Sequence, residues 1–258
     1  MSGRGEFLVR RLLREFARPV TGDPSRRRLV ESLTRGGHLF PEARVLALLA
    51  PPEFLAELAR TGASVTAVEP LEPLWEHGRQ QVATTGTVVH WVRRDPSRLS
   101  FRRAFDVVIG IGLFLGTTGS ESDDQGLLQT LAEALRPGGS LVLDLPNREL
   151  LIREFVERFW ADLDDLRVLV QQAWDLPAGI VRVDWHLVWP HGHWEHHQAT
   201  VRLYTASELA TRSREAGFVE ARWWGDDDAS PYQLWSPRML FVGRVAGDGE
   251  EPLAVGGE

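Results

Sequence analysis

The chain has 258 residues, a formal net charge of −7 at pH 7 and no cysteine. This length suits one large α/β domain or a domain with an insertion, the acidic balance argues against a nucleic-acid partner, and the lack of cysteine excludes disulfides and thiolate metal sites. No apolar run reaches the length of a membrane span, and the charged N-terminus lacks a cleavable signal pattern, so we expect a soluble cytoplasmic protein without a membrane partner. All 29 basic residues are arginine, which we attribute to coding bias rather than heat adaptation.

Two amphipathic helices are predicted at the start of the chain. The first covers Glu6 to Ala17. The second has Asp23 as N-cap and Pro24 at the first helical position, and it ends before Gly36 and Gly37. Their arginine runs could bind phosphate, but a solvated helix face is the favoured interpretation in an acidic chain.

A strand, a tight turn, a helix and a second strand are predicted next. Val45 to Leu49 is a short apolar run typical of a strand buried on both faces, and two consecutive prolines end it. The pattern then takes a helical period up to Gly62, and Ala63 to Val68 alternates as a strand that leads to Glu69. A βαβ unit with an acid at this strand end is the layout of a nucleotide site, in which the acid accepts hydrogen bonds from a ribose.

A helix from Leu71 to Val82 and a third strand from Thr87 to Val92 follow, and the strand leads into Asp95 and Pro96. Two interpretations of Asp95 stay open. Its carboxylate can accept the exocyclic amine of an adenine, or it can cap the turn before the proline.

The next strand covers Ala104 to Ile111 and leads into a loop with three glycines, where the backbone can pass close to a ligand. Ser122 and Gln125 have the spacing of a capping box for the helix that follows. A strand from Ser140 to Leu145 comes after that helix.

The last third of the chain departs from a plain alternation of strands and helices. A helix is predicted from Glu149 to Ala161, and then three β-like runs separated by turn sequences indicate an antiparallel meander at residues 162–204. Thr205 and Glu208 form a capping box for the final helix. The three runs are Arg167 to Trp174, Ile180 to Trp189 and Trp194 to Tyr204, and the last two predicted strands are Val219 to Trp224 and Arg238 to Val245.

This pattern resembles the class I S-adenosylmethionine (SAM)-dependent methyltransferases from about Ala43 to Val245. The Phe-Asp-Val-Val strand, the capped helix and the sequence LRPGGSLVLDLPNRE match the family in residue type and in spacing. The first strand departs from it. The acid and the G-x-G-x-G turn of the family are replaced by Ala47, Leu49, Pro51 and Glu53.

The resemblance implies a Rossmann-like α/β fold with a seven-stranded, mostly parallel sheet of order 3-2-1-4-5-7-6, N-terminal helices and an inserted antiparallel β meander. We expect residues 1–245 to form one domain, with residues 1–40 as a helical lid, and residues 246–258 to form a disordered acidic tail. The predicted cofactor-binding residues are Leu49, Ala50, Pro51, Glu69, Pro70, Asp95, Pro96, Gly110 and Ile111, and the predicted substrate-binding residues are Tyr232 and Trp235.

Two functions are compatible with these residues. The first is SAM-dependent methyl transfer to a small molecule, for which orientation rather than a fixed nucleophile carries catalysis. The second is a catalytically inactive methyltransferase-fold protein that serves as a scaffold or partner subunit. The substituted turn favours weak or lost SAM binding, because each change costs on the order of 1–2 kcal/mol. The retained acids Glu69 and Asp95 favour the enzyme.

Histidine and tryptophan are concentrated in the last third of the chain. His191, His193, His196 and His197 surround a probable turn and lie on both strand faces, so we predict no metal site there. Most of the ten tryptophans are expected to pack the meander onto the parallel sheet, with Trp235 as the exception.

Overall fold

The structure is a computed structural model. It describes residues 25–112, 115–118, 120–163 and 166–250. The predicted first helix, Glu6 to Ala17, lies outside the described residues, as do Asp23 and Pro24. Among the described residues, no helix is both long enough and apolar enough to cross a membrane.

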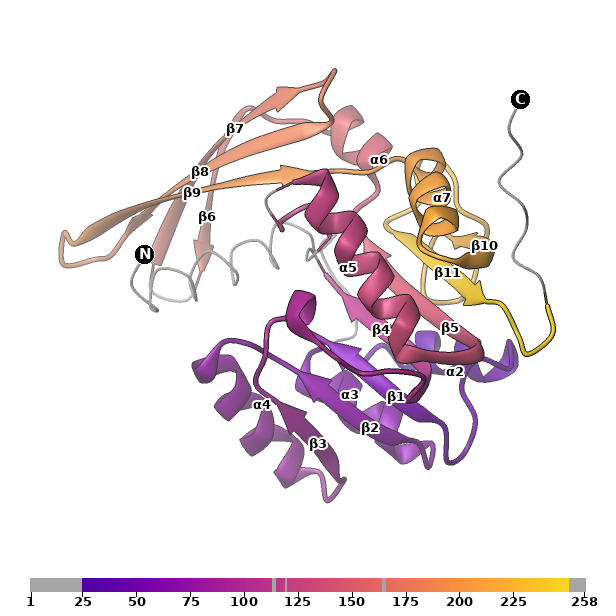
Figure 1. Ribbon diagram of the computed structural model, residues 1–258. Helices are drawn as coiled ribbons and strands as arrows, with labels where there is room; N and C mark the ends of the chain where they lie inside the picture. Colours follow the sequence, from indigo (N-terminus) through magenta and orange to yellow (C-terminus); the bar gives the residue numbers. More distant parts are fainter. Residues whose placement is uncertain (1–24, 113–114, 119, 164–165, 251–258) are drawn as a thin grey trace.

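A seven-stranded sheet forms the centre of the molecule (Figure 1). Its strands are β1 (Arg44–Leu48), β2 (Ser64–Val68), β3 (Val89–Val92), β4 (Phe105–Ile111), β5 (Leu135–Leu145), β10 (Phe218–Trp224) and β11 (Met239–Val245). Their order is β10-β11-β5-β4-β1-β2-β3, which confirms the predicted order. The first five strands pair in parallel, whereas β11 pairs antiparallel with β5 and β10 pairs antiparallel with β11.

Helices cover both faces of this sheet, as a buried parallel sheet requires. The helices around this sheet are α2 (Arg27–Arg35), α3 (Pro52–Arg60), α4 (Glu72–Thr84), α5 (Glu121–Ala134) and α7 (Ala206–Glu215). Because side chains alternate along a strand, Val45 and Ala47 pack in the core cluster with α2 and α3, while Leu46 and Leu48 pack in the cluster with α5 and α7. Helix α2 is therefore part of the sheet's covering layer.

A second, four-stranded antiparallel sheet projects beyond the first on the side of α6 (Arg148–Arg153), at upper left in Figure 1. Its strands are β6 (Arg158–Leu163), β7 (Leu166–Asp175), β8 (Ile180–Val188) and β9 (Trp194–Arg202). The predicted helix from Glu149 to Ala161 is thus wrong beyond Arg153. Residues 158–163 pair with β7 as a hairpin, and this pairing outweighs their local helical pattern.

The meander has a hydrophobic core of its own, in which Trp185 is buried. Trp160 and Trp194 are exposed, so the packing role predicted for most of the tryptophans does not apply to these two.

The helix boundaries differ from the prediction in two places. Helix α2 begins at Arg27 with Arg26 as N-cap, and α5 is capped by the hydroxyl of Ser120, which accepts from the amide of Asp123, rather than by Ser122. The capping box of Thr205 and Glu208 is confirmed.

The first residues of the predicted acidic tail form a turn. Arg244 on β11 pairs with Glu250, whose carboxylate also accepts from the amide of Gly247. Residues 246–250 are therefore held against the end of β11.

Candidate functional site

The predicted cofactor-binding residues meet at the carboxyl edge of the parallel strands. Leu49, Glu69 and Asp95 follow β1, β2 and β3, while Gly110 and Ile111 end β4. The strand ends are joined by backbone hydrogen bonds, from Leu49 N to Val68 O at 3.0 Å and from Glu69 N to Val92 O at 3.1 Å. Ligands of open α/β sheets bind at this edge.

Leu49 keeps the backbone conformation of a glycine in the turn after β1. Its φ is +53°, in the left-handed region that costs a non-glycine residue about 1–2 kcal/mol. The side chain is only 7% exposed and belongs to the core cluster beneath α5. The turn therefore follows the path expected of a glycine-rich turn, and burial of the leucine side chain offsets the strain.

The start of α3 is poor in hydrogen-bond donors. Pro51 is the N-cap and Pro52 the first helical residue, so two backbone positions here carry no N–H. Glu53 adds a carboxylate to the first turn, where the helix dipole otherwise favours an anionic ligand. This end of the site is unsuited to a ligand carboxylate.

Glu69 and Asp95 both accept hydrogen bonds from the segments that follow them. Glu69 is 5% exposed, and its Oε1 accepts from the amide of Leu71 at 3.1 Å, at the start of α4. Asp95 Oδ1 accepts from the amide and the hydroxyl of Ser97, at 2.9 and 2.7 Å. The capping interpretation of Asp95 is thus the observed geometry, and its contact with adenine stays a prediction.

A cavity of about 660 Å³ opens beside these residues. Its lining includes Leu49, Asp95, Pro96, Thr117, Thr118 and Asp123. The volume lies within the range of small-molecule sites. Among the residues that the structure describes, this lining holds two carboxylates and several hydroxyls but no basic side chain. It therefore suits a ligand that donates hydrogen bonds, such as a nucleoside. Among the predicted cofactor-binding residues, Leu49, Asp95 and Pro96 line this cavity.

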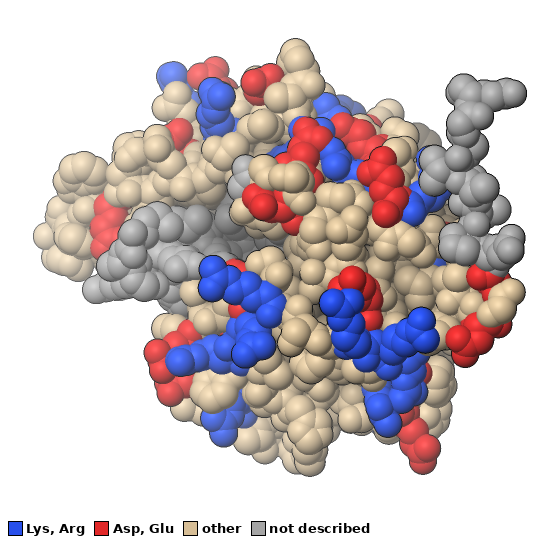
Figure 2. All heavy atoms as spheres, viewed as in Figure 1, with Lys and Arg blue, Asp and Glu red and all other residues tan. Residues whose placement is uncertain are grey.

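Charges on the face seen in Figure 2 are mixed, with acidic and basic side chains interspersed and no continuous basic surface in view.

Comparisons with known proteins agree with this geometry. Residues 52–139 match a family described as methyltransferase domain. An S-adenosylmethionine-dependent methyltransferase from Clostridium acetobutylicum superposes with a TM-score of 0.74 at 13% identity, over 88% of this chain and 93% of that one. The chain has the class I methyltransferase fold. The resemblance seen in the sequence is thereby confirmed.

Two further structures with this fold are similar to the chain. The CcbJ methyltransferase from Streptomyces caelestis has a TM-score of 0.72 and 20% identity, over 88% of this chain and 97% of that one. A SAM-bound amino pentose methyltransferase from Micromonospora echinaspora has a TM-score of 0.61 and 17% identity, over 86% of this chain and 92% of that one. A comparison with curated protein sequences finds no match.

The predicted substrate-binding residues lie beside the end of β5 in this methyltransferase fold. The Tyr232 hydroxyl is 2.8 Å from Asn147 Oδ1 and 2.6 Å from Glu149 Oε2. Burial, together with the hydrogen bond to Glu149, raises the pKa of Tyr232, so its phenol stays protonated. Trp235 is 64% exposed, and its contact with a substrate stays a prediction.

The loop that carries these two residues is anchored by Asn147. This side chain is 1% exposed, and its amide nitrogen lies within 3.3 Å of three backbone oxygens of residues 233, 234 and 236. The amide oxygen meanwhile accepts from the first turn of α6. The sequence suggested no role for this residue.

A buried ion-pair network at the end of β5 was also missed. Asp144 Oδ2 accepts from Arg26 at 2.6 Å and from Arg238 at 3.0 Å, and Arg26 also binds Asp227. The sequence feature that could have indicated this network is Asp144, an acid within the apolar strand β5, because a buried carboxylate needs partners. The network fixes the loop before β11 to the sheet.

The histidine cluster is distributed over the meander. His186 and His196 stack with ring centroids 4.6 Å apart, and His196 lies 2.9 Å from Asp184. In the part of the chain that the structure describes, no three side chains are grouped so that they could hold a metal ion. The absence of a bound metal stays a prediction.

Proposed function

We propose that the protein is a SAM-dependent methyltransferase that acts on a small molecule. The observation that carries the proposal is the cavity at the carboxyl edge of a methyltransferase-fold sheet, beside a turn in which Leu49 keeps a left-handed conformation. This cavity supports the proposal because ligands of open α/β sheets bind at this edge, and the turn beside it has no glycine of the family pattern.

The nucleoside half of SAM fits the residues present. Asp95 would accept a hydrogen bond from the exocyclic amine of adenine through Oδ2. The two hydrogen bonds from Ser97 both end on the other carboxylate oxygen, Oδ1. Glu69 would hold the ribose at the end of β2, and the backbone of Gly110 and Ile111 would pass beside the ring. When bound, SAM would supply an electrophilic methyl group, and these residues would hold its nucleoside in a fixed orientation.

The amino-acid half of SAM fits less well. Pro51 and Pro52 remove amide donors, and Glu53 repels a carboxylate. A loss of about 4 kcal/mol would lower a micromolar affinity to the millimolar range. This start of α3 is the feature that favours the second candidate, an inactive methyltransferase-fold subunit.

The acceptor side of the site would be formed by Tyr232 and Trp235 and by the meander. The amino pentose methyltransferase among the similar structures supports a small polar acceptor, because that enzyme acts on an amino sugar. The carboxylates of the cavity favour a neutral or cationic ligand over an anionic one.

Titration calorimetry with SAM and with its demethylated product, S-adenosylhomocysteine, tests the proposal. We expect saturable binding of both, weakened at least tenfold by Glu69→Gln because charge-assisted hydrogen bonds to ribose are worth about 1.5–3 kcal/mol. Asp106→Asn, at the opposite edge of the sheet, is the control and should bind as wild type does. If neither ligand binds at millimolar concentration, the inactive subunit becomes the better account.

A further inference from the structure

Asp124, in the first turn of α5, is a buried carboxylate that the site described above does not use. It is 2% exposed, and its carboxylate accepts hydrogen bonds from three donors. Its Oδ1 accepts from the amide of Gly116 at 2.8 Å and from the hydroxyl of Thr118 at 2.8 Å, and its Oδ2 accepts from the phenol of Tyr204 at 2.6 Å. A carboxylate that accepts from three donors ties the segments carrying those donors together.

One of these donors, the Thr118 hydroxyl, belongs to a wall of the cavity, and a second, the Gly116 amide, lies just before that wall in the chain. Thr117 and Thr118 line it, and they follow directly on Gly116. Gly116 itself is held from the other side, because its carbonyl accepts from the amide of Arg202 at 2.9 Å. Its φ is +87°, and a Cβ at this position would lie 2.0 Å from the Arg202 carbonyl, so only glycine fits.

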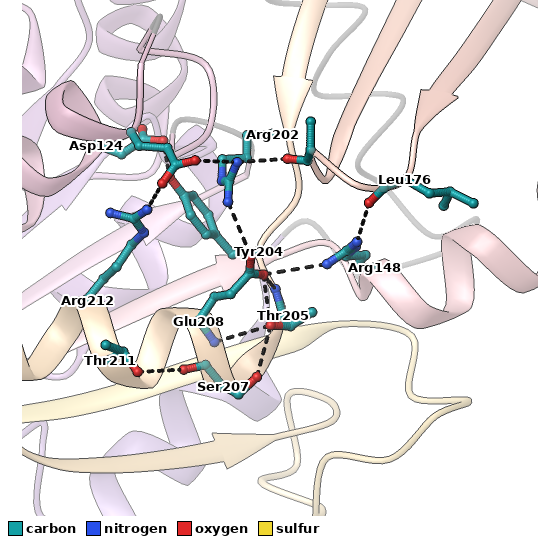
Figure 3. Close-up of polar contacts among 12 residues, drawn as sticks. Asp124, Arg148, Leu176, Arg202, Tyr204, Thr205, Ser207, Glu208, Thr211 and Arg212 are labelled. Carbon is teal, nitrogen blue, oxygen red and sulfur yellow. Dashed lines mark hydrogen bonds and ion pairs between the residues drawn. The ribbon is translucent and has the colours of Figure 1, made fainter. Parts of the chain in front are cut away.

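Tyr204 comes from a distant part of the chain and connects this wall to the meander. It lies two residues after β9, and the guanidinium groups of Arg202 and Arg212 lie 5.1 and 5.4 Å from its ring centroid. Both arginines pair with Glu121, which is the first residue of α5. Figure 3 shows Tyr204, Arg202 and Arg212 gathered beside Asp124.

The phenol of Tyr204 remains a donor at any physiological pH. Burial raises its pKa, and the hydrogen bond to Asp124 raises it further. The hydrogen bond that links the meander to the cavity wall is therefore not lost through deprotonation of Tyr204.

We propose that Asp124, held by Tyr204, is a positioning residue that fixes residues 116–118 as the cavity wall against which the cofactor binds. The inference rests on the proposed function. Asp124 touches no ligand itself. It holds the segment that carries Thr117 and Thr118 in one conformation before a ligand binds. Binding then does not have to order this segment, and the entropic cost that would lower the affinity is avoided.

Two variants test the proposal, with one control. Tyr204→Phe removes the hydroxyl and keeps the ring, and Asp124→Asn removes the charge and keeps the shape. Asp106→Asn is the matched control, because Asp106 accepts from the amide of Arg44 at 2.8 Å and from Arg136 at 3.0 Å at the opposite edge of the sheet.

Hydrogen exchange of the ligand-free proteins and SAM titration are measured at a temperature where every variant is folded. We expect exchange at the Gly116 amide to rise at least tenfold in both variants, and SAM affinity to fall about five- to tenfold. The control should lower the melting temperature without either effect.

Unchanged exchange at Gly116 would overturn the proposal. So would faster exchange combined with wild-type SAM affinity, because Asp124 would then hold a loop that the ligand does not need. If wild type binds no SAM, the proposed function fails, and the exchange measurement alone decides whether Asp124 fixes the wall.

Discussion

Replacing Leu49 with glycine sets two effects of opposite sign against each other. The leucine side chain is 7% exposed in the core, and removing such a side chain costs about 2–5 kcal/mol. Glycine at a φ of +53° relieves about 1–2 kcal/mol of backbone strain. We expect a net loss of about 2 kcal/mol in the free energy of unfolding, which lowers Tm by about 4–8 °C for a chain of this size.

Leu49→Ala is the matched control for this experiment. It removes nearly the same side chain but keeps a Cβ in the left-handed conformation. Urea denaturation of the two variants should therefore show the glycine variant to be the more stable, by about 1 kcal/mol. If the alanine variant is equally stable or more stable, the left-handed turn at this position is refuted.

The same approach gives two further predictions. Glu69→Ala should lower the free energy of unfolding by about 1–3 kcal/mol, because the buried amide of Leu71 loses its acceptor, whereas Glu69→Gln keeps an acceptor; equal losses in urea denaturation would contradict this. Burial tends to raise the pKa of Glu208, but hydrogen bonds from Thr205 outweigh it and hold that pKa below its ordinary value of 4.5. Its contribution to stability is therefore present above that ordinary value and is lost as the pH falls through the lowered one. The difference in unfolding free energy between wild type and Glu208→Gln should shrink from neutral pH to about pH 3, and a constant difference would count against the capping role.

The seven-stranded sheet could be predicted because its information is local. Each strand is a short apolar run, and helices with recognisable stops separate the first five strands of the sheet. The order of the strands was not contained in this local pattern and was implied by the resemblance to the methyltransferases. The helix predicted over part of Arg158 to Leu163 was wrong because the information that decides this segment is not local. Its residues suit a helix, and only pairing with the strand that follows makes it a hairpin.

The candidate site was predictable only where it follows from the ends of strands. The βαβ layout indicated Glu69, and the resemblance indicated Leu49 and Asp95. The structure brings all three to one edge of the sheet. The conformation of Leu49 was not predictable, since glycine is the residue expected at positive φ. The bond between Tyr204 and Asp124 joins residues 80 apart in the chain, and no local pattern announces it.

The arrangement of the meander limits how it could be exchanged between related proteins. The chain enters through β6 and leaves through β9, which are the two outer strands of the four-stranded sheet. At about 4.8 Å per strand spacing, these two outer strands lie about 14 Å apart across the sheet, too far for a tight turn to replace the whole unit. A chimaera would have to import all four strands as one module. It would also have to retain Arg202 and Tyr204 at the exit, since these residues reach back to the neighbouring helices.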